Sequence, residues 1–319
     1  MTALYTGKIL KIGAENKALE VENEGTRMLQ GTLIRGIGSF YTALDGEGNQ
    51  YTLRCKKKFR RQGISPLTGD EVMFSPGTGE EHGWIEEILP RKTFCLRPPV
   101  ANVTRLVIVL APVPEPDLTL ADRMISRAVA QQIEILLAVN KTDLDPTLAD
   151  RIREEYRAAG FPVFPVSGKL KTGLEPLREA MKGALCCLTG QSGAGKSTLL
   201  NALLELKLET SELSEKIARG KNTTRQSELI EKDGLRVMDT AGFNLLEPEK
   251  PLQPEQLRER YPEFRNYEGK CRFRECLHDR EPGCAVQEAA DRGEIHVNRL
   301  LRYRQLLAET REVWRERYD

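Results

Sequence analysis

The chain has 319 residues, which is enough for two or three domains that each bury a core. Its 48 Lys and Arg residues against 47 Asp and Glu residues leave a net charge of +1, so any binding to nucleic acid must rest on local patches. The longest apolar run, residues 106–113, is too short to span a bilayer, and the first thirty residues lack the apolar core of a signal peptide. We therefore expect a cytoplasmic protein with no membrane partner.

The first part of the chain reads as a short extension followed by a small β-barrel. Residues 1–27 are β-prone and their role is open. From residue 28 to residue 97, short alternating segments are separated by Gly, Asp and Pro turns, and five strands at this spacing favour an OB-fold. The expected strands are residues 31–37, 40–44, 50–55, 71–74 and 83–88.

From residue 98 to residue 250, strands and helices alternate, which is typical of an α/β domain. The continuous apolar runs in this region are of the kind found in buried parallel strands. The expected strands are residues 105–111, 134–139, 161–166, 184–189 and 235–239, and the expected helices are residues 121–132, 148–159 and 197–206. Residues 251–319 are more polar and carry a Cys/His cluster, followed by a charged helix from residue 295 to about residue 315.

Residues 190–197 read Gly-Gln-Ser-Gly-Ala-Gly-Lys-Ser, a complete GxxxxGK[ST] phosphate loop between an expected strand and an expected helix. Glycines are needed there because backbone amides must approach the phosphates without obstruction, and the following helix directs its positive end at them. We expect Lys196 to reach the β- and γ-phosphate oxygens and the Ser197 hydroxyl to bind Mg²⁺. The bland alternative is a Gly-rich turn. The predicted phosphate site comprises Gly190, Gln191, Ser192, Gly193, Ala194, Gly195, Lys196, Ser197 and Thr198.

Asn140-Lys141-Thr142-Asp143 follows a buried strand and matches the tetrapeptide that reads guanine. The Asp143 carboxylate can accept from the N1 and N2 donors of guanine, a pair that adenine lacks, so it would select GTP over ATP. Lys141 would lie along the base, and Asn140 would tie this loop to the phosphate side. Alone, the motif could be a solvated turn, but a phosphate loop in the same domain supports the guanine reading. Ser167 and Gly168, after the next strand, fit the loop that supports guanine O6.

Asp239-Thr240-Ala241-Gly242 ends a strand and matches the loop that senses the γ-phosphate. We expect Asp239 to hold Mg²⁺ through water and the Gly242 amide to meet the γ-phosphate. Thr223 or Thr224 is the expected switch threonine that closes over Mg²⁺, a reading supported only by their position between the phosphate loop and Asp239.

The base reader precedes the phosphate loop, whereas an ordinary GTPase has the phosphate loop first. The same pocket must therefore be built from a circularly permuted chain. The predicted fold class is multidomain: an N-terminal OB-fold β-barrel, a central α/β circularly permuted P-loop GTPase domain over residues 98–250, and a C-terminal zinc-binding module with helices over residues 251–319.

Cys271, Cys276, His278 and Cys284 lie within fourteen residues. Three thiolates and one imidazole form the ligand set of a closed, tetrahedral, structural zinc site with no open position for catalysis. The alternative is three unrelated cysteines and a surface histidine. We expect one Zn²⁺ per chain.

Six of the eight residues from 54 to 61 are basic, and Phe59 lies among them. A charge run of this kind is usually a solvated face, but on a loop of an OB-fold it is also a plausible contact for nucleic acid. The candidate RNA contacts are Arg54, Lys56, Lys57, Lys58, Arg60 and Arg61.

With its motifs in this permuted order, an OB-fold before them and a CxxxxCxHxxxxxC module after them, the chain resembles the ribosome small-subunit-dependent GTPase A family (RsgA). The resemblance runs from about residue 28 to the end and includes Arg-Pro-Pro-Val-Ala-Asn-Val at residues 97–103. It implies a bacterial factor of late small-subunit assembly that binds ribosomal RNA and hydrolyses GTP when docked on the subunit. The implied cofactors are GTP or GDP, Mg²⁺ and Zn²⁺, the implied partner is the small ribosomal subunit, and we expect a monomer.

Catalysis is where the sequence departs from the pattern. Phe243 stands where many GTPases have a water-orienting Gln, as is usual for the RsgA family, whose members commonly have a His before the switch threonines. At that place this chain has Asn222, which can hydrogen-bond a water but cannot share a proton as His can. The second hypothesis is therefore a GTP-gated RNA-binding assembly factor with little hydrolysis of its own. A P-loop kinase or ATPase is disfavoured by Asp143.

Overall fold

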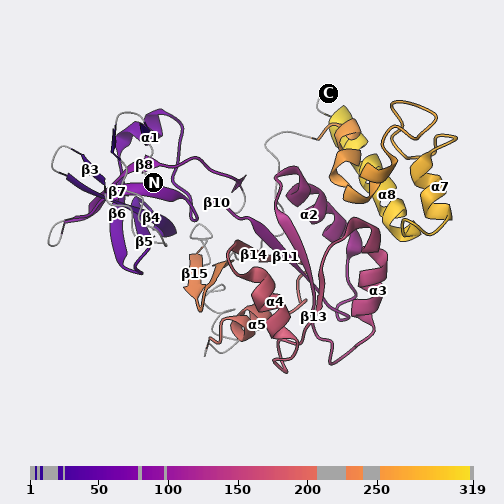
Figure 1. Cartoon of the computed structure of the whole chain (residues 1–319), viewed down its shortest axis with the longest axis horizontal. Helices are drawn as coiled ribbons and strands as arrows, with labels where there is room; N and C mark the ends of the chain where they lie inside the picture. Colours follow the sequence, from indigo (N-terminus) through magenta and orange to yellow (C-terminus); the bar gives the residue numbers. More distant parts are fainter. Residues whose placement is uncertain are drawn as a thin grey trace.

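The computed structural model describes residues 4–5, 8–9, 21–23, 26–77, 81–96, 99–206, 228–239 and 252–316. Figure 1 shows three parts along the long axis of the molecule: a barrel, a central α/β domain and a group of C-terminal helices. Among the described residues, no helix combines the length and the apolar character needed to cross a membrane.

The barrel has five strands, as the sequence predicts. They pair in the order β4-β5-β6-β8-β7, and β7 pairs back with β4 to close the barrel. A short helix, α1, follows the third strand and the third and fifth strands are parallel, which is the OB-fold topology. The elements are β4 (Thr26–Ile37), β5 (Phe40–Asp45), β6 (Gln50–Cys55), α1 (Lys57–Arg61), β7 (Glu71–Ser75) and β8 (Gly83–Ile88).

Short strands flank the barrel. The N-terminal ones are β1 (Leu4–Tyr5), β2 (Lys8–Ile9) and β3 (Val21–Asn23), and β3 pairs with the start of β4. A small antiparallel pair, β9 (Phe94–Leu96) and β10 (Pro99–Ala101), connects the barrel to the central domain.

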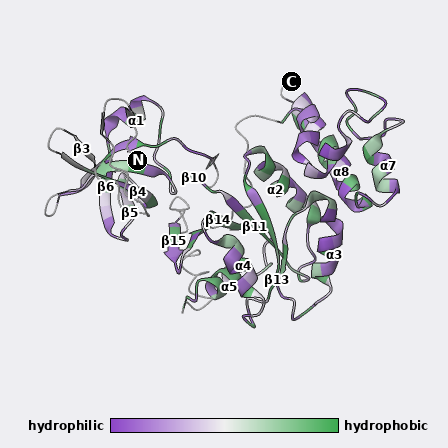
Figure 2. Ribbon diagram, viewed as in Figure 1, coloured by the Kyte–Doolittle hydropathy of each residue, from purple (hydrophilic) through white to green (hydrophobic). Residues whose placement is uncertain are grey.

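The central domain is a sheet in the order β13-β12-β11-β14-β16-β15, in which the first five strands are parallel and β15 is antiparallel. Helices α2 and α3 cover one face and α4 and α5 the other, so the sheet strands are apolar on both faces (Figure 2). The elements are β11 (Arg105–Leu110), α2 (Leu118–Ala130), β12 (Glu134–Val139), α3 (Leu148–Glu155), η1 (Arg157–Ala159), β13 (Val163–Pro165), α4 (Leu174–Met181), β14 (Leu185–Thr189), α5 (Lys196–Leu203), β15 (Glu228–Lys232) and β16 (Leu235–Asp239).

The barrel and the central sheet are joined by backbone pairing. β15 pairs with β4 at Glu228 and Arg35, so the two sheets are continuous. Arg236 on β16 strengthens the joint, because its guanidinium donates to the Thr32 hydroxyl at 2.8 Å and lies 3.6 Å from the Glu71 carboxylate.

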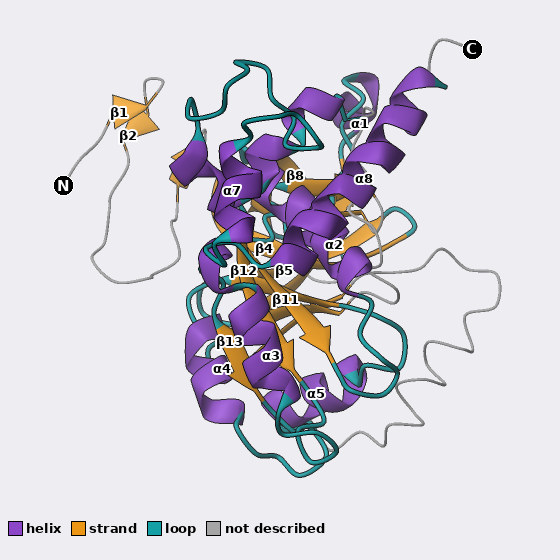
Figure 3. Ribbon diagram, turned by 90° about the vertical axis from the view of Figure 1, so that its right-hand side faces the viewer, coloured by secondary structure: helices purple, strands orange, loops and turns teal. Residues whose placement is uncertain are grey.

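The C-terminal part packs on the α2–α3 face of the central domain (Figure 3). Arg299 on α8 is 1% exposed and is ion-paired to Asp122 on α2 at 2.5 Å and to Glu263 at 2.7 Å. Arg302, one turn further on, reaches both Asp122 and Glu155. The elements are η2 (Pro254–Gln256), η3 (Arg258–Arg260), η4 (Pro262–Tyr267), α7 (Ala285–Asp291) and α8 (Val297–Arg315).

Candidate nucleotide site and metal centre

The phosphate loop connects the fully buried strand β14 to the first residue of α5. Gly190 has φ +137° and a Cβ there would lie 2.2 Å from the Val109 carbonyl oxygen, so no larger residue fits. Gly195 has φ +87° and a Cβ there would lie 2.5 Å from the Asn140 amide. The close approach of neighbouring loops, and not only the approach of a ligand, therefore requires glycine at both positions.

Lys196 is half-buried at the start of α5, and burial lowers the pKa of its amine. Its Nζ donates to the carbonyl oxygens of Gly190 at 2.8 Å and Gln191 at 2.9 Å. The ammonium thus lies across its own loop, within reach of any anion that the loop holds. Among its neighbours, Ser192 and Ser197 are exposed, Thr198 is half-buried and Ala194 is buried.

Asn140 joins the three loops that the sequence assigns to the nucleotide, and it is 1% exposed. Its Nδ2 donates to the Ala194 carbonyl at 3.0 Å, within the phosphate loop. Its Oδ1 accepts from the Gly168 amide at 2.9 Å, within the loop after β13. The Asn140 side chain therefore fixes the loops at residues 168 and 194 relative to its own loop, although these loops are 28 and 54 positions away from it in the sequence.

Lys141 and Thr142 extend this framework. The Lys141 Nζ donates to the Gly193 carbonyl at 2.8 Å and to the Val113 carbonyl at 2.6 Å. The Thr142 hydroxyl donates to the Val166 carbonyl at 3.1 Å. The stem of Lys141 consequently spans from the base-reading loop to the phosphate loop.

Asp143 is exposed at the outer end of this framework. The fully buried Ser167 donates its hydroxyl to Asp143 Oδ1 at 2.6 Å. This hydrogen bond is the main cause that holds the pKa of Asp143 below its usual value, with help from Lys169 and Lys141. The carboxylate is therefore ionised at neutral pH and oriented, with acceptor capacity left for a ligand.

The segment between β11 and α2 also contributes to the site, although its motif-free sequence did not predict this. The Val113 carbonyl binds Lys141, and Pro114 would lie 3.1 Å from a Cβ at Gly193. The backbone amide of Asp117 donates to Gln191 Oε1 at 2.9 Å, so the segment is held against the phosphate loop. The sequence feature that could have identified this segment is its position after a buried strand, because ligand-contacting loops lie at the carboxyl ends of parallel strands.

The γ-phosphate side is only partly described. β16 pairs with β14 and ends at Asp239, which places that residue at the same edge of the sheet as the phosphate loop. The remaining predicted residues on this side lie outside the described part of the chain: Asn222, Thr223, Thr224 and Gly242.

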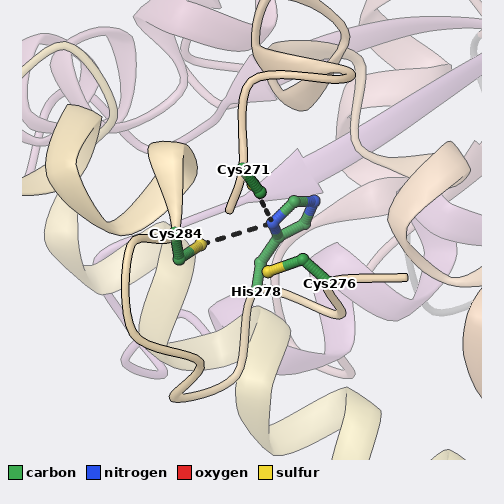
Figure 4. Close-up of side chains that lie close together, drawn as sticks. All are labelled: Cys271, Cys276, His278 and Cys284. Atoms are coloured by element: carbon green, nitrogen blue, oxygen red, sulfur yellow. Dashed lines mark hydrogen bonds between the residues drawn. The ribbon is translucent and has the colours of Figure 1, made fainter. Parts of the chain in front are cut away.

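The three cysteines and one histidine come together, as Figure 4 shows, with their candidate ligand atoms within 4.8 Å of one another. The Nδ1 of His278 lies 3.4 Å from the Cys284 sulfur and 3.6 Å from the Cys271 sulfur, so Nδ1 is the nitrogen that faces the cluster. His278 adopts φ +58°, which turns its ring back towards the cysteines on either side.

The donor chemistry of the cluster suits a thiophilic metal ion. Burial raises the pKa of the Cys276 thiol to about 12, and burial together with Arg258 lowers the pKa of His278 to about 4. A neutral imidazole and thiols that need a positive charge in order to ionise are what a thiophilic metal ion converts into ligands. Cys284 is also the N-cap of α7, and its sulfur accepts from the Gln287 amide at 3.4 Å. The donor set and its closed arrangement fit Zn²⁺.

The basic run lies on the end of β6 and on α1, a short helix where the sequence analysis expected a loop. Lys56 forms an ion pair with the Glu86 carboxylate, and Lys58 donates to the Glu86 carbonyl. Lys57 and Arg61 are exposed. Part of the positive charge is therefore compensated within the barrel.

The chain is similar to known proteins over most of its length. The chain matches the RsgA GTPase family over residues 88–249 and the RsgA N-terminal domain family over residues 30–85. It is 42% identical to the small ribosomal subunit biogenesis GTPase RsgA of Ruminiclostridium cellulolyticum, over 90% of this chain and 95% of that protein. It is 40% identical to the protein of the same name from a Geobacillus species, over 89% of this chain and 98% of that protein.

Two solved structures are similar as well. The crystal structure of YjeQ from Thermotoga maritima has a TM-score of 0.76 and 31% identity, covering 89% of this chain and 98% of its own. YloQ, described as a circularly permuted GTPase, has a TM-score of 0.73 and 31% identity, covering 89% of this chain and 96% of its own.

Proposed function

This chain belongs to the RsgA family of GTPases, and from that premise we propose that it hydrolyses GTP during late maturation of the small ribosomal subunit. It docks on the subunit through ribosomal RNA and works as a cytoplasmic monomer. Residues 28–97 contact RNA, residues 98–250 bind the nucleotide, residues 251–319 form the zinc module, and the role of residues 1–27 is open. The observation that carries the proposal is Asn140, which connects the phosphate loop and the guanine-reading loops into one site.

Each loop has a distinct part in the reaction. The amides of residues 190–195 and the Lys196 ammonium bind the β- and γ-phosphates and offset the charge that develops in transfer. Ser197, Thr223 and Asp239 offer the hydroxyl and carboxylate oxygens that Mg²⁺ prefers, and bound Mg²⁺ would neutralise phosphate charge. Asp143 accepts from guanine, and the Gly242 amide meets the γ-phosphate.

The zinc module has a structural part. Cys271, Cys276, His278 and Cys284 provide all four ligands of a tetrahedral ion, which leaves no position for a reacting water. Zinc would therefore stabilise the fold of residues 271–284 for docking and take no part in hydrolysis.

A second function, a GTP-gated RNA-binding factor with little hydrolysis, is favoured by Asn222. The two are separated by measuring GTP turnover by the purified protein with and without small ribosomal subunits. We expect the subunits to raise turnover at least tenfold. Nucleotide-dependent binding to subunits with unchanged turnover would favour the second function, and no binding at all would reject both.

A further inference from the structure

The outer face of the barrel carries a row of large side chains that follows from strand register. Ile37 on β4 is paired with Phe40 on β5, Phe40 with Arg54 on β6, and Arg54 with Trp84 on β8. Directly paired residues point to the same side of a sheet. The neighbours Leu53 and Ile85 are fully buried in the barrel core, so the row Ile37–Phe40–Arg54–Trp84 faces outward.

This row is largely apolar, and its two ends are open to solvent. Ile37 is 47% exposed and Trp84 is 43% exposed. An outward-facing position of a barrel does not require a large apolar side chain. Phe40 is half-buried and Arg54 is exposed. Exposed apolar side chains that lie in one contiguous row, unlike those scattered singly, indicate a contact surface.

Two polar side chains, Arg54 in the row and His82 beside it, contact the Phe40 ring. The Arg54 guanidinium carbon lies 4.7 Å from the centre of the Phe40 ring, and the His82 ring meets the same Phe40 ring edge-on at 4.8 Å. Among the described residues Arg54 has no carboxylate partner, whereas its neighbour Lys56 is paired with Glu86. Arg54 thus contributes a positive charge to the row, close to the Phe40 ring.

We propose that the row Ile37–Phe40–Arg54–Trp84, with His82 beside it, is a stacking platform for consecutive bases of unpaired RNA. This inference rests on the proposed function. Aromatic faces accept any base, and a guanidinium between them pairs with phosphate or stacks in turn. Strands in a sheet lie about 4.8 Å apart, so the backbones of β5 and β8 lie about 10 Å apart at Phe40 and Trp84, with Arg54 between them, and each ring can take one base of the strand.

A duplex would not use this surface. Its bases are already stacked and paired, so only phosphates and sugar hydroxyls are offered to the protein. A surface that binds duplex RNA would need cations spread over it to contact the phosphates. In this row, a duplex would leave the side chains of Ile37, Phe40 and Trp84 uncovered. The platform also approaches the central domain, because Arg35, two residues before Ile37, pairs with Glu228 at the start of β15.

The chain provides its own probe, since it contains only two tryptophans, Trp84 and Trp314. In the Trp314→Phe protein, all tryptophan fluorescence comes from Trp84. We expect a single-stranded 12-nucleotide polyadenylate RNA to quench it on binding, and a 12-base-pair RNA duplex to compete at least tenfold more weakly.

Variants in the same background test the stacking itself, with binding followed by the fluorescence anisotropy of a fluorescein-labelled polyadenylate, because the Trp84 variants then contain no tryptophan. Trp84→Ala and Phe40→Ala should each weaken binding of the polyadenylate about tenfold without changing its salt dependence, and Trp84→Phe should keep most of the affinity. Arg54→Ala should weaken binding and also flatten the salt dependence by about one phosphate contact. Arg54→Lys should keep the salt dependence but lose affinity, because an ammonium does not stack. GDP affinity, measured on each preparation, reports that the fold is intact.

These experiments distinguish a failure of the stacking platform from a failure of the proposed function. Unchanged Trp84 fluorescence and equal polyadenylate affinity for Trp84→Ala would overturn the platform, and subunit-stimulated GTP turnover by the Trp314→Phe protein would then still support the proposed function. Loss of subunit binding in Trp84→Ala with normal polyadenylate binding would overturn RNA as the partner and indicate a ribosomal protein. Absence of stimulation in the Trp314→Phe protein would reject the proposed function, whereas quenching with the expected variant pattern would support the platform.

Discussion

At the scale of single residues, we propose that the selection of guanine depends on a carboxylate that is oriented before any ligand arrives. Ser167 donates to one oxygen of Asp143, which leaves the other for the donors of a base. We expect Asp143→Asn to lower GTP affinity about tenfold or more, because an amide donor then faces a guanine donor. Xanthosine triphosphate should become the better ligand. Competition binding with the two nucleotides measures this, and an unchanged preference for GTP would show that residues 140–143 form only a turn.

We propose that Asn222 sets the rate at which the site hydrolyses GTP. Phe243 cannot orient a water, His278 is in the metal cluster, and the described His82 lies on the barrel. We expect the free protein to hydrolyse GTP on the order of 10⁻⁴–10⁻³ s⁻¹, the range of GTPases without their activator. On small subunits, Asn222→His should raise the stimulated rate and Asn222→Ala should lower it. Equal single-turnover rates for the three proteins would make Asn222 a bystander.

Much of the site at this scale could be predicted from the sequence, because its motifs have fixed chemistry over short spacing. The glycines at 190 and 195 and the lysine at 196 belong to one continuous loop. The bond from Asn140 to Ala194 could be anticipated only as a link between two motifs, since its geometry depends on the packing of β12 against β11 and β14. The pairing of Lys56 with Glu86 was missed, because the partner lies thirty residues downstream on another strand.

At the scale of elements, the zinc module is expected to need its metal in order to fold. Zinc binding by such ligands releases about 10–16 kcal/mol in small modules, more than a segment of this size gains from its own packing. Cys276→Ser should unfold residues 271–284 and weaken docking on subunits, while GTP binding by the free protein stays nearly intact. Cys55→Ser, a half-buried cysteine of the barrel, is the matched control.

Elemental analysis measures the metal content directly. The parent protein and Cys55→Ser should each carry close to one zinc per chain, and Cys276→Ser should carry little. A parent protein with well under one metal per chain would contradict a structural zinc site.

The attachment of α8 to α2 depends on a buried charge cluster. Arg299 lies between Asp122 and Glu263 and against the rings of Tyr156 and Tyr261. Removing one partner of a buried ion pair leaves the other uncompensated, which costs about 3–5 kcal/mol. Arg299→Met should lower the free energy of unfolding by that amount.

Denaturant unfolding followed by circular dichroism measures the effect of Arg299→Met. Arg292→Met removes an exposed ion pair of the same C-terminal part and should leave the unfolding midpoint almost unchanged. Equal midpoints for the two variants would mean that the buried cluster does not hold α8 in place.

Most elements could be predicted, and the exceptions have physical reasons. The five barrel strands are short β-prone segments between Gly, Asp and Pro turns, so their bounds agree within a few residues, apart from β4, which begins at Thr26 and not at residue 31. β15 was missed because Glu228, Glu231 and Lys232 give it a polar sequence, as befits a strand that pairs at a domain joint instead of in the core. The helix α1 was read as a loop because five residues are too few to show a periodicity.

At the scale of the whole molecule, we expect the permutation to connect the γ-phosphate sensor to the zinc module. β16 ends at Asp239, and the described chain resumes at residue 252, close to the cluster in sequence. Because γ-phosphate sensing commonly changes the order of nearby loops, we expect a GTP analogue and GDP to give different hydrogen exchange in residues 251–284 on the subunit. Identical exchange in the two states would remove this link.

The sheet order also has a consequence for synthesis of the chain. β11 lies between β12 and β14, but β14 begins at residue 185, 75 positions after β11 ends at residue 110. At about 5–20 residues per second, the nascent chain would expose the open edge of β11 for several seconds. Exposed strand edges are templates for aggregation, so this interval is when the growing protein needs protection. The joint between β15 and β4 forms still later, and it closes the molecule by pairing one of its last strands with one of its first.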